Sequence, residues 1–232
     1  MKIIDHKKKI ERNRKIGLFS SLGSLVILIG GFILSLQGPD QLAPAYGALL
    51  VGLLLSQVGI YYGNRWGRSP RMDERLTQAL KGLDDRYTLY HYVTAVPHLL
   101  TGPSGVWVLV PQHQPGTITY ENSRFHQKGV FFLSRLFAQE GLGRPELEAQ
   151  AYQQDMEKFL KKSLPEEQEI PAVQPAIIFV HPKATVQAAD SPIPAMHVEK
   201  LKDFVRRKGK EQSVSMAAIR PVTSVLPEES IS

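Results

Sequence analysis

Two long uncharged runs stand out near the start of the chain. Gly17 to Leu36 and Ala45 to Tyr62 are each long enough to cross the hydrocarbon core of a bilayer as a helix, which takes about 17–25 residues. Neither run has a polar face, so a helix buried in a soluble protein explains them poorly. Residues 37–44 form a short polar break between the runs. We therefore predict a transmembrane hairpin with helices over residues 17–36 and 45–62.

Basic residues flank the outer ends of both runs, whereas the break between them contains no Lys or Arg. The positive-inside rule then places both ends of the hairpin in the cytoplasm, as in a multi-pass protein of a bacterial-type inner membrane. A cleaved signal peptide is the alternative, because Ala43-Pro44-Ala45 resembles a cleavage site, but its apolar core would be only about 7–15 residues long. The residues expected at the membrane interface are Lys7, Lys8, Lys9, Arg12, Arg14, Lys15, Tyr61, Tyr62, Arg65, Trp66, Arg68 and Arg71.

Small residues recur in the second run at a spacing of four, which lets two helices approach closely. They are Ala48, Gly52 and Ser56. We expect this stripe to pack on the first helix, which offers Ser20, Ser24, Gly30 and Gly31. Neither run contains a charge or a proline break, so a transport or channel function is not indicated.

From Met72 onward the apolar pattern alternates between the periods of helices and strands. Val106–Val110 reads V-W-V-L-V, which is typical of a strand covered on both faces, and Pro111 is expected to end it. A tight turn, Gly102-Pro103-Ser104-Gly105, joins this strand to the one before. Further strands are expected over residues 87–93, 96–101, 117–120, 176–180 and 193–198, and helices over 72–83, 145–164 and 199–208. The predicted class is α/β, with a mixed central sheet flanked by helices.

This pattern divides the chain into five parts. They are a basic cytoplasmic N-terminus (1–16), the transmembrane hairpin (17–62), a juxtamembrane linker (63–71), a cytosolic α/β domain (72–209) and a flexible tail (210–232). Residues 70–208 are expected to fold on their own. The helix after Pro145 should bury Leu147, Ala151, Met156, Phe159 and Leu160, and Gly209 should end the last helix. Residues 125–137, with the apolar group 130–133, fit either a strand or a short helix.

The net charge of +6 bears on nucleic-acid binding only through its location. Residues 1–75 hold 11 Lys and Arg against 5 Asp and Glu, which accounts for the whole excess, and the rest holds 17 against 17. A nucleic-acid-binding domain normally has a basic footprint of its own, and by count this domain has none, although a local basic face around residues 200–210 stays open. The chain has no Cys, which excludes disulfides and thiolate metal sites.

The hairpin core of the domain resembles the nuclease-related domain (NERD) family of the PD-(D/E)XK nuclease superfamily over about residues 70–208. The residues that match the pattern of that family are His98, Gly102, Pro103, Gly105, Val106, Val108, Gly116 and Ile118. The resemblance implies a restriction-endonuclease-like fold. It also implies an Asp, a Glu and a Lys as catalytic residues, but Pro97, Val110 and Gln112 stand at those positions. Carboxylates are what hold a catalytic Mg²⁺ beside a phosphate, so we predict that the site has no activity.

Other candidate chemistry is sparse. The resemblance suggests a metal-assisting glutamate at Glu74 and a helix glutamine at Gln150 or Gln153, but solvated surface roles explain all three residues better. The spacings of His91, His98, His113 and His126 match no familiar zinc pattern. Ser104 lies outside any G-x-S-x-G context and is expected to be a turn residue. We expect no cofactor.

The primary functional hypothesis is a bilayer-anchored, non-enzymatic binding or scaffold module with a protein partner that the sequence does not identify. One alternative is a membrane-tethered, metal-dependent nuclease with a relocated site that uses Glu74 and a carboxylate from the 146–157 helix. A second alternative is a non-catalytic nucleic-acid binder.

Overall fold

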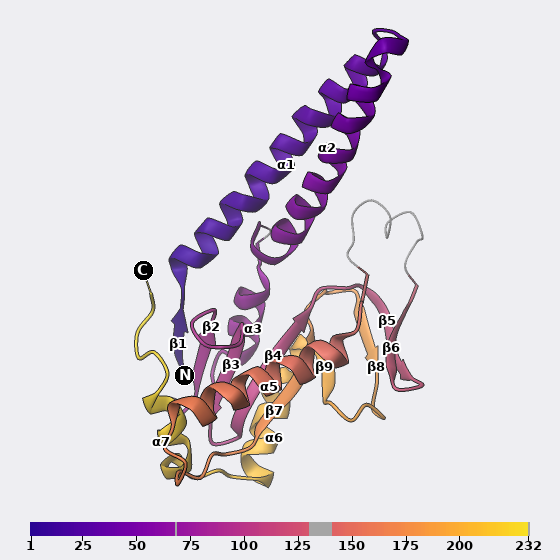
Figure 1. The fold of residues 1–232 in the computed structure, drawn as a ribbon. Coiled ribbons are helices and arrows are strands. Elements are labelled where there is room, and N and C mark those ends of the chain that lie inside the picture. The colour runs from indigo at the N-terminus through magenta and orange to yellow at the C-terminus, as the bar shows by residue number, and fades with distance from the viewer. Residues whose placement is uncertain (68, 130–140, 232) are drawn as a thin grey trace. The chain divides into compact units, whose positions relative to one another are not determined.

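The computed structural model describes residues 1–67, 69–129 and 141–231 (Figure 1). The chain forms two compact units. One comprises Lys8–Arg71, and the other combines Met1–Lys7 with Met72–Ser232. The apolar group 130–133 and the interface residue Arg68 lie outside the described residues.

The first unit is a helical hairpin. Helix α1 (Lys7–Ser35) is followed by a 3₁₀ turn (η1, Pro39–Gln41), helix α2 (Leu42–Tyr62) and a π-helical turn (η2, Gly63–Gly67). The structure has two helices in this region that are long and apolar enough to cross a membrane. Many large apolar side chains are exposed to solvent, among them Phe19 at 67%, Val26 at 69% and Leu54 at 61%. Surfaces of this kind are stable in lipid and unfavourable in water.

The two helices contact each other through small residues spaced by seven. Gly17, Ser24 and Gly31 are buried on α1, and Ala45, Gly52 and Gly59 on α2. A Cβ atom added at Gly31 would lie 3.0 Å from the Cβ of Ala48, and one added at Gly52 would lie 2.7 Å from Cγ of Leu28. Of the predicted stripe, Ala48 and Gly52 do contact α1, but the buried small residues on both helices recur every seven positions rather than every four. A spacing of seven keeps one seam of a helix against an antiparallel neighbour.

The second unit contains two sheets. The central sheet has the strand order β1-β2-β3-β4-β7-β9 and the smaller sheet the order β6-β5-β8. The central strands are β1 (Lys2–Asp5), β2 (Thr88–His91), β3 (His98–Gly102), β4 (Gly105–Gln112), β7 (Val173–Phe179) and β9 (Ala195–His197). The smaller sheet contains β5 (Gly116–Glu121), β6 (Arg124–Lys128) and β8 (Ala184–Gln187). Because β2, β3 and β4 are antiparallel while β1, β7 and β9 pair in parallel, the sheet is mixed.

Helices cover both faces of the central sheet, which confirms the predicted α/β class. Their bounds are α3 (Met72–Leu80), α5 (Pro145–Ser163), α6 (Leu201–Glu211) with its leading 3₁₀ turn (η3, Val198–Lys200), and α7 (Met216–Ser224). On β4, Val106, Val108 and Val110 share one apolar core with residues of α5 and α7. Trp107 and Leu109 belong to a second core with residues of α3 and α6. This two-sided burial is the reason that β4 is apolar at five consecutive positions.

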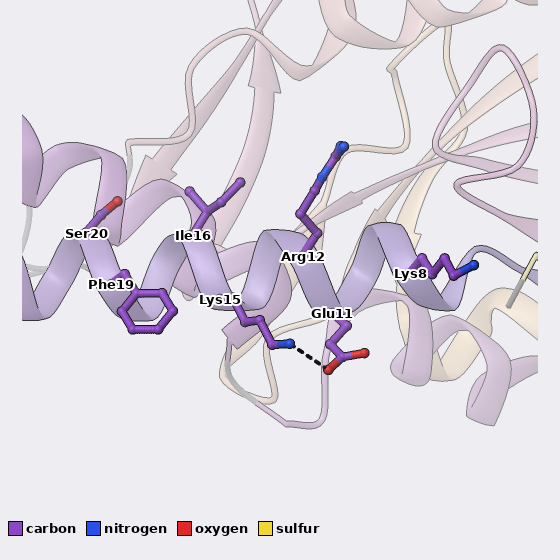
Figure 2. Close-up of a pocket in the computed structure, with 7 residues that line it drawn as sticks. All are labelled: Lys8, Glu11, Arg12, Lys15, Ile16, Phe19 and Ser20. Atoms are coloured by element: carbon purple, nitrogen blue, oxygen red, sulfur yellow. Dashed lines mark ion pairs between the residues drawn. The ribbon is translucent and has the colours of Figure 1, made fainter.

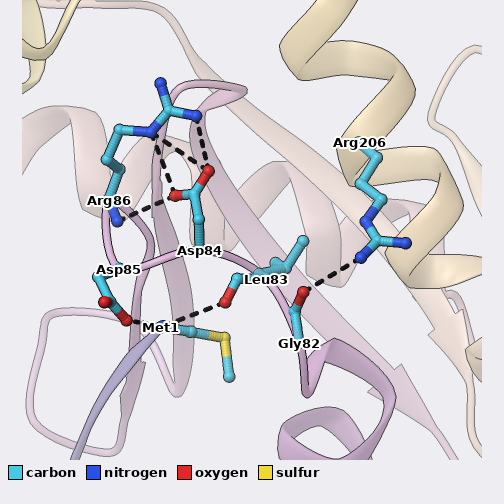
Figure 3. A network of polar contacts seen from close by, with 7 residues as sticks. All are labelled: Met1, Gly82, Leu83, Asp84, Asp85, Arg86 and Arg206. Atoms are coloured by element: carbon cyan, nitrogen blue, oxygen red, sulfur yellow. Dashed lines mark hydrogen bonds and ion pairs between the residues drawn. The ribbon is translucent and has the colours of Figure 1, made fainter.

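The ends of the second unit differ from the sequence-based expectation. Residues 2–5, expected in a basic cytoplasmic N-terminus, form β1, which pairs in parallel with β2 and buries Ile4 to 1% exposure. The main-chain nitrogen of Met1 donates to the Leu83 carbonyl at 3.2 Å and to Asp85 at 3.0 Å (Figure 3). The expected flexible tail contains α7, with Ile219 and Val222 in the core. Both elements are stabilised by apolar burial, which outweighs their polar composition.

Smaller differences have local causes. β4 continues through Pro111 because β3 pairs with β4 only as far as Val108, so that edge needs no donor at Pro111. α6 continues past Gly209, where a side chain would lie 2.8 Å from the Tyr87 hydroxyl, so this glycine permits a close approach rather than a helix stop. The buried face of α5 contains Ala149, Met156 and Leu160, whereas Leu147 and Ala151 are exposed. β8 was not predicted.

Candidate functional site at the polar end of the central sheet

The candidate site lies where β2 and β4 end and β3 begins. Register brings these strand ends together, since His91 pairs with His98 at the β2–β3 junction. On the other side of β4, Gln112 pairs with Phe179 at the end of β7. The polar side chains at this end therefore come from segments that are distant in sequence. We refer to it as the polar end of the sheet.

A pair of buried imidazoles forms the centre of the polar end. Nδ1 of His91 lies 2.8 Å from Nδ1 of His98, and both residues are 2% exposed. Nε2 of His91 lies 2.9 Å from the hydroxyl of Thr77 on α3. Burial, and then the charge on His91, lowers the pKa of His98 well below its ordinary value of 6.5. Because one Nδ1 must donate and the other must accept, the pair shares a single proton across the contact.

The connection between β2 and β3 packs around this pair. Tyr92 adopts a left-handed backbone conformation, with φ at 62°, and its N–H donates to the Pro97 carbonyl at 2.7 Å. Its ring lies edge-on to His98, with 4.8 Å between centroids. A bulky residue with positive φ costs about 1–3 kcal/mol, so the surrounding contacts must hold the loop in this form.

A second polar contact connects β4 to α5. The amide of Gln112 donates to Glu148 at 2.8 Å, and the Tyr152 hydroxyl donates to the other oxygen of the same carboxylate at 3.1 Å. Sequence reasoning did not identify Glu148, Tyr152 or Thr77, because only the packing of α3 and α5 on the sheet brings them to the strand ends.

The residues that the resemblance aligns with catalytic positions lie in the core, in a strand connection and in a contact with α5. Val110 is 1% exposed and belongs to the apolar core, and Pro97 lies in the β2–β3 connection. Gln112 contacts Glu148 as described. On the helices, Glu74 is half-buried on α3, Gln150 is exposed, and Gln153 donates to Glu157 at 2.9 Å.

Of the four histidines considered, the structure brings His91 and His98 into contact. His126 lies in the smaller sheet, where its Nε2 is 3.2 Å from the Glu121 carbonyl. Within residues 1–67, 69–129 and 141–231, no group of three or more His, Cys, Asp and Glu side chains is arranged to hold a metal ion. Ser104 lies in the β3–β4 turn and its carbonyl accepts the Trp107 indole N–H at 2.8 Å.

The basic residues of α6 make structural contacts. Lys202 donates to the Lys81 carbonyl at 3.3 Å, and Arg206 donates to the Gly82 carbonyl at 3.1 Å (Figure 3). These carbonyls follow the end of α3, where helical acceptors lack intrahelical partners. Arg207 and Lys208 pair with Glu211 at 3.7 and 3.1 Å. This segment therefore caps a neighbouring helix and pairs internally.

At the end of the hairpin, the predicted interface aromatics pack together. The ring of Tyr62 lies 5.3 Å from Tyr61 and 5.2 Å from Trp66, measured between centroids, and the Arg65 guanidinium lies 3.9 Å above the ring of Tyr61. Such a cluster suits the headgroup level of a bilayer.

No family model, curated protein or solved structure matches this chain. The resemblance to the nuclease-related domain family therefore stays a prediction based on the residues given above.

Proposed function

We propose that this chain is a membrane-anchored, non-enzymatic binding or scaffold module for a protein partner. Its second unit is taken as a restriction-endonuclease-like domain. Support for that fold is the order of the elements, in which the antiparallel strands β2, β3 and β4 are followed by a crossover through α5 to the parallel strand β7.

The observation that carries the proposal is the position of Val110. A catalytic glutamate must reach solvent and substrate, but the side chain at this position packs in a core shared with α5 and α7. An ionised carboxylate there would be buried without a partner, at a cost of several kcal/mol. Val110 thus stabilises the core at the position where metal-dependent hydrolysis would need a charged carboxylate.

A relocated metal-dependent nuclease is the second candidate, and one contact favours it. Gln112 stands at the position of the family lysine and contacts Glu148 at 2.8 Å. One carboxylate is therefore beside this position, and a partly buried Glu74 on α3 is the second ligand that this candidate would use.

A cleavage assay on the purified full chain separates the two candidates. We expect no chelator-sensitive cleavage of DNA or RNA with Mg²⁺ or Mn²⁺, because loss of one stabilising group already costs about 10²–10³ in rate. Cleavage that is lost in Glu148→Gln but retained in Glu157→Gln would establish the relocated nuclease. Glu157 is the matched control because it lies on the same helix and also contacts a glutamine amide. Cleavage insensitive to both variants would indicate a contaminating nuclease.

The proposed orientation places both flanks of the hairpin in the cytoplasm, and the absence of Cys makes it directly testable. A single cysteine replaces either Asp40 in the loop between α1 and α2 or Glu167 after α5, both of which are exposed. An impermeant maleimide should label Asp40→Cys in intact spheroplasts and Glu167→Cys only after lysis. The reverse pattern would overturn the orientation.

A further inference from the structure

We propose that the outer face of α1 binds an anionic phospholipid, with the phosphate held by Lys8 and Arg12 and an acyl chain lying beside Ile16 and Phe19. This inference rests on the proposed membrane anchoring and adds a specific lipid class to it.

The site is a groove along one face of α1, with a volume of about 540 Å³. Figure 2 shows two rows of side chains that flank it. One row contains Lys8, Arg12, Ile16 and Ser20, and the other contains Glu11, Lys15 and Phe19. Rows of residues spaced by four form ridges on a helix, and the space between adjacent rows is the groove into which a neighbouring group packs.

The end of the groove that contains Lys8 faces away from α2. Gly17, which is buried in the hairpin seam, follows Lys8 by nine residues. At 3.6 residues per turn this is two and a half turns, so the two residues lie on opposite sides of the helix. In a membrane, this end of the groove is therefore open to lipid.

Charge is uneven along the groove. Lys15 pairs with Glu11 at 3.1 Å. Across the described ranges of the chain, Lys8 and Arg12 make no contact with an acidic group. These two cations leave one end of the groove with an excess positive charge, while Ile16 and a 67% exposed Phe19 line the other end. A phosphate followed by a hydrocarbon chain matches this order.

Depth along the helix agrees with this assignment. The uncharged run begins at Gly17, and Arg12 precedes it by five residues, or roughly 7.5 Å at 1.5 Å per residue. The headgroup layer adds about 5–7 Å on each side of the hydrocarbon core, so the Cα atom of Arg12 lies at the outer edge of this layer and its long side chain can reach the phosphates. A second copy of the same face is a poorer occupant, because it would bring like charges together.

The test uses the full chain in phosphatidylcholine vesicles with trace spin-labelled lipid. Electron paramagnetic resonance reports the fraction of labelled lipid that the protein immobilises. We expect labelled phosphatidylglycerol to be immobilised preferentially over labelled phosphatidylcholine. The ratio of immobilised phosphatidylglycerol to immobilised phosphatidylcholine should fall toward one in Lys8→Gln/Arg12→Gln. Loss of each cation should lower this ratio by at most about fivefold. The double variant Lys7→Gln/Arg14→Gln removes the same two residue types outside the groove and should retain the preference.

Each remaining outcome has a defined meaning. Equal preference for both lipids in the wild type, or equal loss in both double variants, would overturn the proposal in favour of diffuse charge attraction. Loss of the preference in phosphate buffer, compared with chloride at equal ionic strength, would assign the site to free phosphate and also overturn it. If neither labelled lipid is immobilised, the proposed membrane anchoring is wrong. This outcome differs from failure of the lipid site alone, in which labelled phosphatidylcholine is still immobilised.

Discussion

His91 and His98 contact each other inside the domain, where each is only 2% exposed. The Nδ1 atoms are 2.8 Å apart, and the neighbouring groups include the Thr77 hydroxyl and the Tyr92 ring. Protonation of both rings would place two positive charges in contact in a region of low dielectric constant, where their repulsion is strong. The pair therefore holds the ends of β2 and β3 together only while His98 is neutral.

This leads to a prediction about stability and pH. The folded pKa of His98 lies below its unfolded value of about 6.5, so below that pH the unfolded chain binds the extra proton and stability falls. The expected slope is up to about 1.4 kcal/mol per pH unit. It should be smaller in His98→Gln and unchanged in His126→Gln, as measured by Trp107 fluorescence during unfolding of a Trp66→Phe background. His181, whose pKa burial also lowers, adds to the slope of all three proteins. Parallel profiles for wild type and His98→Gln would contradict this account.

At the scale of elements, the sequence predicts those strands and turns that have a strong local pattern. The five apolar residues of β4 predict burial on both faces, and the turn at Gly102–Gly105 is predicted from its glycines, of which Gly105 has φ at 104°. β1 and β8 were missed because each has only four residues and Lys, Asp, Thr or Gln interrupts its pattern. α7 was missed because Pro221 lies inside it. The contacts of the polar end depend on strand register, which the sequence alone does not define.

The seam of the hairpin gives a prediction at the same scale. Because the chain contains no Cys, a designed pair has no competitor. Gly31→Cys with Ala48→Cys should form a disulfide on mild oxidation, since the added Cβ lies 3.0 Å from that of Ala48 and a separation of the helices by about 0.5 Å reaches the 3.5–4.5 Å that disulfides need. Gly30→Cys with Ala48→Cys is the matched control, because a Cβ at Gly30 meets nothing within 4 Å. After proteolytic cleavage of the chain between the two helices, the fragments should migrate together on a non-reducing gel only if the disulfide has formed. Equal cross-linking in both pairs would mean that the seam is wrong.

At the scale of the molecule, the α/β unit is discontinuous in sequence. Residues 1–7 and 72–232 form it together, and the hairpin is inserted between β1 and α3. The C-terminal segment adds to the same edge, since the Ile231 N–H donates to the Asp5 carbonyl at 2.8 Å and the Lys7 N–H donates to the Ile231 carbonyl at 2.9 Å. A fragment of residues 70–208 lacks both β1 and α7, and is thus expected to be less stable than the complete α/β unit.

A shortened protein tests this organisation. Residues 1–7 joined to Met72 by a flexible glycine-serine linker should give a soluble protein that unfolds cooperatively. Residues 72–232 alone should unfold at lower denaturant. Ile4→Asp in the linked protein should remove most of the gain, because it buries an unpaired charge at a cost of several kcal/mol. Ile3→Asp is the control, since Ile3 is 42% exposed. Equal midpoints for the linked protein and residues 72–232 would show that β1 contributes nothing to stability.

The pairing of β1 with β2 also bears on how the protein is made. Lys2 pairs with Thr88, and the whole hairpin is synthesised between them. During synthesis, β1 therefore stays unpaired until both helices of the hairpin and then β2 have left the ribosome. In the proposed transmembrane arrangement, β1 can pair with β2 only if the chain crosses the bilayer an even number of times, because one crossing would leave the two strands on opposite sides. In that arrangement, completion of the central sheet depends on correct membrane insertion, and a chain inserted with one crossing is expected to leave the sheet incomplete and the domain open to proteolysis.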